Sequence, residues 1–282
     1  MHVVRSAAPL LLIAIVVGCS SRPDLASWRS SDPRPRLQAE RRSIELELQA
    51  VDTLRIAQDL AGARKLALTL AAENPQNAAA LAAASRAESD AVHYLQRSLG
   101  ADSKAARDLA AWSALDYARR AAAGGNAPEV IEAQLAWALG TSTHLQGMFS
   151  RAGHARETLA AVDRALARNP NEPTALATLS VLRLRLATLP WIARAMAWGA
   201  PKGSIDEAVA HARKATEALP SLQHKLLLAS ALVAAEKEEE AALVLDTALQ
   251  LPDAFPRDRE LRRQAEELSR SLAQKLAKRN AG

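Results

Sequence analysis

Apolar and small side chains recur with helical spacing along most of the chain, and four segments end in the same way. Each segment places its apolar residues on one face of about four helical turns. Each then closes with a proline, which cannot continue a helix. The pattern predicts four amphipathic helices, over residues 60–75, 155–170, 205–220 and 239–252.

The last two of these segments share a spacing of small residues. Ala208 and Ala215 in one correspond to Ala241 and Ala248 in the next, 33 residues further along the chain. Small residues allow two helices to approach closely, and the spacing resembles the 34-residue period of the tetratricopeptide repeat (TPR). A TPR unit is a pair of helices. Segments 172–187 and 221–237 are predicted to form the first helices of two such pairs.

The remaining periodic segments complete the predicted array. Residues 77–99 and 102–123 are predicted to form a degenerate pair, because they lack the signature residues of the repeat. Residues 256–279 have one apolar face and are otherwise charged. A helix of this kind can cover the exposed end of an array and keep its outer face polar. The sequence therefore predicts an all-α fold, a TPR-like right-handed α-solenoid of antiparallel helix pairs with a C-terminal capping helix.

Composition agrees with this fold class. Hydrophobic residues make up 49% of the 282 residues but aromatic residues only 3%, and much of the apolar content is alanine, the best helix former. The net charge of +5 does not indicate nucleic-acid binding, because basic residues alternate with acidic ones along the helices. We expect no nucleic-acid partner.

The N-terminus carries an apolar run from Ala7 to Gly18, which is too short to cross a bilayer. It follows one basic residue and reads as a secretory signal. Its end, Val16-Val17-Gly18-Cys19, resembles the bacterial lipobox, which implies that Cys19 is lipidated and anchors the chain. The alternative is an ordinary signal peptide. Cys19 is the single cysteine of the chain, so it cannot form an internal disulfide.

These features predict a signal peptide over 1–18, a lipidated cysteine and flexible tether over 19–37, and a helical domain over 38–282. By resemblance to known lipoproteins, Ser20 after the cysteine implies the outer membrane of a Gram-negative bacterium, with the domain facing the periplasm. The protein would then contact the membrane through its lipid anchor.

The repeat is interrupted over 189–203 by an insertion that includes PWIARAMAWGAPK. With the helix that follows, it resembles two groups: the TatT-like lipoproteins associated with TRAP transporters, and the TPR domain of the eukaryotic regulators of microtubule dynamics. The first resemblance implies a cavity for apolar ligands and pairing with a transporter substrate-binding subunit.

Aromatic residues are the candidate site residues. Trp191 and Trp198 share a helical face within the insertion. We hypothesise that Trp191, Ile192, Ala195 and Trp198 form a ligand wall or a partner anchor. The alternative is that the insertion covers its own repeat. Trp112 and Trp137 stand at helical spacing with leucines and are expected in the core.

No catalytic or metal-binding motif is present in the sequence, and no two histidines stand three or four residues apart. We therefore expect no enzyme activity, no cofactor and no metal site. Two functions remain open: a scaffold that binds a protein or peptide segment of the cell envelope, and a TatT-like accessory of a TRAP-type transporter that binds a small apolar ligand.

Overall fold

The computed structural model describes residues 34–99, 103–147, 150–190 and 201–280. The chain divides into two compact units, residues 1–47 and 48–282. In the first unit the described residues form the beginning of helix α2 (Arg34–Ile56), which starts inside the segment predicted as a tether. The account below concerns the second unit.

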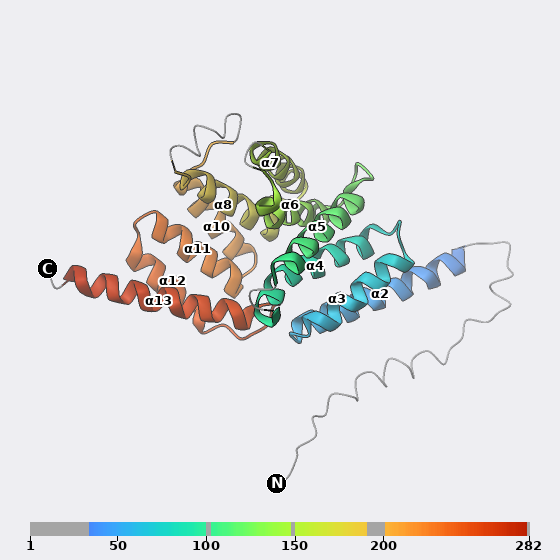
Figure 1. The fold of residues 1–282 in the computed structure, drawn as a ribbon, viewed down its shortest axis with the longest axis horizontal. Helices are drawn as coiled ribbons and strands as arrows, with labels where there is room; N and C mark the ends of the chain where they lie inside the picture. The colour runs from blue at the N-terminus through green and yellow to red at the C-terminus, as the bar shows by residue number, and fades with distance from the viewer. Residues whose placement is uncertain (1–33, 100–102, 148–149, 191–200, 281–282) are drawn as a thin grey trace, which may run out of the picture. The chain divides into compact units, whose positions relative to one another are not determined.

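All regular structure among the described residues is helical (Figure 1). After α2 follow α3 (Leu60–Glu73), α4 (Ala78–Leu99), α5 (Ser103–Ala122), α6 (Glu129–Ser142), the 3-10 turn η4 (Thr143–Leu145), α7 (Arg151–Arg168), α8 (Pro173–Ala187), α10 (Ile205–Ala218), α11 (Leu222–Ala234), α12 (Glu238–Leu249) and α13 (Asp258–Asn280). None of the described helices is both long and apolar enough to cross a membrane.

Each helix from α3 to α13 packs against the next along the chain, and α4, α6 and α8 also pack against one another in turn. Antiparallel pairs that stack only on their neighbours define an α-solenoid. The predicted fold class is therefore confirmed. The terminal helix α13 packs on α11 and α12 and buries Leu261, Ala265 and Leu272, as expected of a cap.

Local signals set the helix ends. Helices α3, α7 and α10 each end two residues before the proline that the sequence analysis singled out. Side-chain caps begin the helices: the hydroxyl of Ser204 accepts from the N–H of Glu207, and that of Ser221 accepts from the N–H of His224.

Small residues fill the positions where helices cross. The four alanines of the predicted repeat, at 208, 215, 241 and 248, are completely buried. Buried serines add hydrogen bonds at equivalent places in two pairs. Ser85 Oγ donates to the Ala114 carbonyl, and Ser180 Oγ donates to that of Ala208, each at 2.8 Å. The alanine content thus serves close helix packing.

Buried carboxylates form ion pairs with arginines of neighbouring helices. Glu88 is almost fully buried and receives two hydrogen bonds from the guanidinium of Arg64, both at 3.0 Å. The carboxylate of Glu132 pairs with Arg164 at 2.9 Å. Each acid lies on one helix and its cation on another, so removing the arginine would leave a buried, unpaired carboxylate.

Two features differ from, or add to, the sequence analysis. Trp112 is 49% exposed, so its expected place in the core is wrong. The buried stripe of α5 consists of alanines and Leu115, and Trp112 lies beside it. At the end of the insertion, Gly203 lies so close to the end of α8 that a Cβ there would overlap the backbone nitrogen of Ala187.

Candidate functional site

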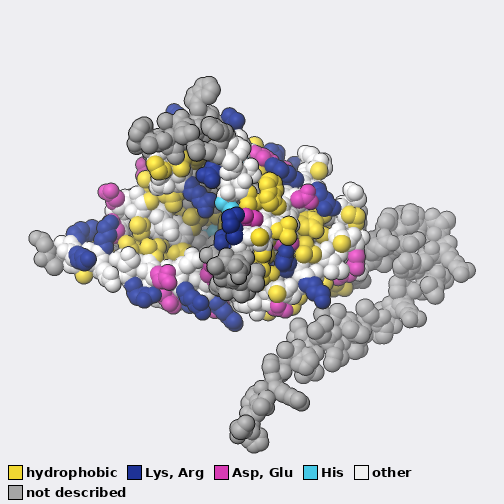
Figure 2. All heavy atoms as spheres, viewed as in Figure 1, with side chains coloured by type: hydrophobic (Ala, Val, Ile, Leu, Met, Phe, Trp, Pro, Cys, Tyr) yellow, Lys and Arg dark blue, Asp and Glu magenta, His cyan; other side chains and the backbone are white. Residues whose placement is uncertain are grey.

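The described residues of the second unit line a cavity of about 520 Å³ that is partly open to solvent. This is within the range of pockets that bind ligands. Figure 2 shows basic side chains and histidine near the centre of the face, between areas of apolar side chains. The lining residues are Val92, His93, Arg107, Trp137, Gly140, Thr141, Thr143, His144, Arg151, Ala155, Thr158, Thr178, Val181, Leu182, Arg185, Leu186, Leu189 and Arg257.

Three helices present a stripe each to this cavity. On α8, Thr178, Leu182 and Arg185 stand four and three residues apart, so they share one helical face. Arg151, Ala155 and Thr158 repeat the spacing on α7. On α6, Trp137 and Thr141 are one turn apart. The stacking of α6, α7 and α8 therefore builds most of the wall.

The lining carries four arginines and two histidines and, within the described part of the chain, no carboxylate. Arg107 Nε donates to the Val92 carbonyl at 3.0 Å, and Arg151 Nε to that of Gln146 at 3.1 Å. The Nη groups of both, and the whole guanidinium of Arg185, have no partner among the described residues. They are available to a ligand.

Arg257 reaches the cavity from the loop between α12 and α13 and is 9% exposed. Its Nε lies 3.6 Å from Glu260 Oε2. Asp258 shapes this loop: its Oδ2 accepts from the N–H groups of Ala254 and Phe255, at 2.9 and 2.7 Å. Burial raises the pKa of the Asp258 carboxyl, against the lowering effect of these bonds.

His144 bridges η4 and α5. Its Nδ1 lies 3.0 Å from the Thr141 carbonyl and its Nε2 lies 3.1 Å from Asp108 Oδ1. Both nitrogens can donate to these oxygens only when the ring is protonated. Lys104 and His144 hold the pKa of the Asp108 carboxyl below its usual value.

Four threonines line the cavity, and each donates its hydroxyl proton to a backbone carbonyl four residues earlier: Thr141 to Trp137, Thr143 to Leu139, Thr158 to His154 and Thr178 to Thr174. Their oxygens keep free lone pairs, so they can only accept further bonds. Donors to a ligand must therefore come from the basic residues.

The residues proposed from sequence, Trp191, Ile192, Ala195 and Trp198, lie outside the described residues, as does Cys19. Trp137, expected in the core, is half-buried and lines the cavity. The sequence analysis missed the arginines. Their signal is the helical spacing from Thr178 to Arg185, which becomes informative only once α6, α7 and α8 are known to share a wall.

Comparisons with known proteins address the family. The family model of Regulator of microtubule dynamics protein 1-3 matches residues 48–273. This match spans most of the chain. The chain belongs to this family. The resemblance to regulators of microtubule dynamics is thereby confirmed, and residues 48–273 coincide closely with the second unit.

The structure is also similar to the crystal structure of a thermophilic TPR protein from Thermus thermophilus. The TM-score is 0.55 at 17% sequence identity, over 80% of this chain and 98% of that one. This likeness shows that the chain, as a member of the regulator of microtubule dynamics family, has a TPR-like fold. No curated protein shows significant sequence similarity to the chain.

Proposed function

We propose that the chain is a non-enzymatic scaffold, which holds a segment of a partner protein in the cavity between α4, α5, α6, α7 and α8. TPR-like arrays present extended concave surfaces suited to this role. The observation that carries the proposal is the cavity itself. Its wall combines apolar side chains with arginine donors that have no partner among the described residues.

The same proposal places the protein in the cell envelope. The lipobox resemblance at Cys19 supports lipidation and attachment to the outer membrane, with the helical domain in the periplasm. Mass spectrometry of the protein extracted from membranes tests this. We expect a mature chain that begins at an acylated Cys19, and release of the Cys19→Ala variant from the membrane fraction. An unmodified thiol would contradict it.

Binding is tested by crosslinking in whole cells. A photoreactive amino acid at Leu182 faces the cavity, whereas one at Leu243, which is 66% exposed on α12, does not line it. We expect a specific protein adduct from position 182 that is absent from position 243. Equal adducts at both positions, or none at 182, would rule out a protein partner in the cavity.

A second candidate is an accessory of a TRAP-type transporter that binds a small apolar ligand and pairs with the substrate-binding subunit. Val181, Leu182 and Leu186, which are among the apolar residues of the wall, favour it. Native mass spectrometry separates the two functions, because a retained small molecule would be seen directly. The arginines of the lining count against a purely apolar ligand.

A further inference from the structure

The chemistry of the cavity restricts what it can hold. Its described lining offers hydrogen-bond donors from guanidinium groups, and hydroxyl oxygens that can only accept. Guanidinium groups pair best with carboxylates and phosphates. A ligand that fits must therefore carry anionic groups, and it gains from having N–H donors as well.

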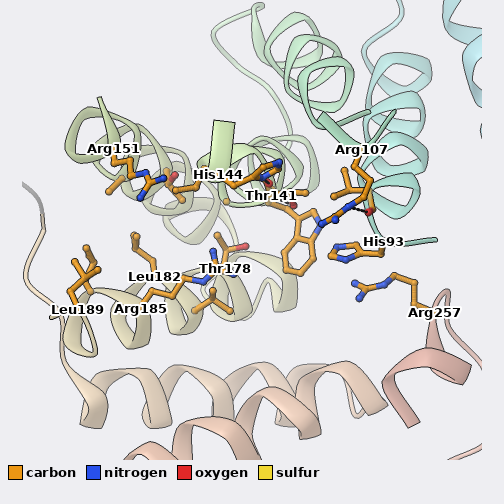
Figure 3. Close-up of a pocket in the computed structure, with 18 residues that line it drawn as sticks. His93, Arg107, Thr141, His144, Arg151, Thr178, Leu182, Arg185, Leu189 and Arg257 are labelled. Carbon is orange, nitrogen blue, oxygen red and sulfur yellow. Dashed lines mark hydrogen bonds between the residues drawn. The ribbon is translucent and has the colours of Figure 1, made fainter. Parts of the chain in front are cut away.

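The basic groups lie at two ends of the cavity (Figure 3). Arg151 and Arg185 are at one side of the view, and His93, Arg107 and Arg257 are at the other, with Thr178 between them. Thr178 and Arg185 are seven residues apart on α8, which is about 10 Å at about 1.5 Å per residue. Because Figure 3 places the arginines of the two ends on opposite sides of Thr178, we assign each end its own carboxylate.

The two ends differ in their neighbouring acids. Arg257, at one end, faces Glu260, so a carboxylate behind the wall offsets part of the positive charge there. Arg185 has no ion-pair partner among the described residues, and Arg151 bonds only the Gln146 carbonyl there. The Arg151–Arg185 end therefore has no carboxylate paired to its arginines among the described residues.

Between the ends, the wall is apolar and hydroxylic. Leu182 and Leu186 follow the same face of α8 as Arg185, and the hydroxyl oxygens of Thr158 and Thr178 remain acceptors. Backbone N–H groups are the donors that a polypeptide supplies along its length. Small dianions such as dicarboxylates lack such donors, so this part of the wall fits a peptide better.

We infer that the cavity binds an acidic, partly apolar segment of the partner, with carboxylates of the segment paired to the arginines at both ends. This rests on the proposed scaffold function. An extended segment advances about 3.3–3.6 Å per residue, so carboxylates that reach both ends lie at least about three positions apart. An apolar side chain between them would contact Leu182.

The test selects peptides without assuming a partner. Full-length protein in mild detergent is used to pan a library of random peptides, and enriched peptides are measured by fluorescence anisotropy. We expect enrichment of pairs of Asp or Glu separated by about three positions and flanked by aliphatic residues. Enrichment of peptides without acidic residues, or no enrichment, would overturn the inference.

Variants that remove single charges then test whether Arg151 and Arg185 bind the selected peptide. Arg151→Gln and Arg185→Gln change exposed side chains and should leave the thermal midpoint unchanged. Together they should weaken binding of the selected peptide by at least about tenfold. Arg263→Gln, on the exposed face of α13, is the matched control and should have no effect. Equal affinity of the double variant and the control would contradict the inference.

The scaffold function and the acidic nature of the bound segment can be rejected independently of each other. If the adduct at position 182 in cells maps to a partner segment without acidic residues, the scaffold function stands and the acidic segment is wrong. If no protein adduct forms there and native mass spectrometry finds a small anion, both are wrong. If the adduct maps to an acidic segment whose change to Gln and Asn abolishes crosslinking, both are supported.

Discussion

The side-chain amide of Gln58, in the turn between α2 and α3, donates a 2.6 Å hydrogen bond to the backbone carbonyl of Phe255, in the loop between α12 and α13. The two residues are 197 positions apart in the chain. The start of the array therefore meets its last turn, and the loop held there also supplies Arg257 to the cavity. Repeat stacking alone would contact only neighbours.

Gln58→Ala tests this long-range contact. Gln58 has a φ of 65°, and Ala meets the same backbone cost there, so the variant isolates the hydrogen bond. We expect a loss of about 1 kcal/mol in the free energy of unfolding. Hydrogen exchange should rise over residues 251–257. Gln76→Ala, in the exposed turn between α3 and α4, should change neither quantity. An unchanged exchange rate over residues 251–257 would show that the hydrogen bond does not stabilise the loop.

Asp258 stabilises the loop between α12 and α13 by accepting hydrogen bonds from the backbone of the loop. Asp258→Ala removes the acceptor of two N–H groups and should cost about 2 kcal/mol in chemical denaturation. Asp258→Asn keeps an acceptor oxygen and should cost less than Asp258→Ala. If the Asn variant is as unstable as the Ala variant, the carboxylate charge rather than the acceptor matters.

The pKa of Asp258 also predicts a pH effect. Because burial raises this pKa in the folded state, the folded protein binds the proton more readily than the unfolded chain does. The group therefore adds stability at pH values below its unfolded pKa, and this contribution is lost as the pH rises through the folded pKa. Denaturation between pH 3 and pH 7 should show a smaller trend in Asp258→Asn than in the wild type, because Glu88 and Glu172, whose pKa values burial also raises, remain in both proteins.

The sequence was sufficient to predict most of the helices and the array, because both depend on local spacing, although α2 and α6 were not among the predicted segments. The terminal prolines mark helix ends, and the fully buried Ala208 and Ala241 mark helix crossings. The site was not predictable in this way. Arg185 and Arg257 look like ordinary surface charges in the sequence, and their place in one cavity follows from packing between helices far apart in the chain.

Trp112 shows that burial cannot always be predicted from the spacing of apolar residues on a single helix. Its spacing with leucines favoured the core, yet the adjoining helices pack on the alanine stripe of α5 and leave the indole 49% exposed. Which of two possible faces is buried depends on the partner helix. In an alanine-rich helix the apolar moment is weak, so the sequence does not settle the choice.

Gly203 fixes the return of the chain after the insertion. Ser204 N–H donates to the Arg183 carbonyl at 3.3 Å and Arg183 Nη1 to that of Lys202 at 2.6 Å, so residues 202–204 lie against the end of α8. Gly203→Ala would place a methyl group into the Ala187 backbone and should cost about 1–3 kcal/mol. Gly124→Ala, which has open space around it, is the control. A thermal midpoint equal to that of the control would mean that the junction can shift.

His211 makes the stability of the array sensitive to acid. It lies on α10, its buried Nδ1 has no hydrogen-bond partner among the described residues, and burial lowers its pKa, with Lys214 and Arg183 adding to the effect against Glu207. The unfolded chain therefore takes up this proton at a higher pH than the folded protein does. The contribution of the neutral ring to stability is present above the unfolded pKa and is lost as the pH falls through it toward the folded pKa.

His211→Leu removes this titration without removing a hydrogen bond from Nδ1. We expect the variant to match the wild type at pH 8 and to be the more stable of the two at pH 5, by urea denaturation. His224, whose pKa burial also lowers, is present in both proteins, so a smaller loss on acidification should remain in the variant. Parallel pH profiles for the two proteins would show that His211 titrates equally in the folded and unfolded states.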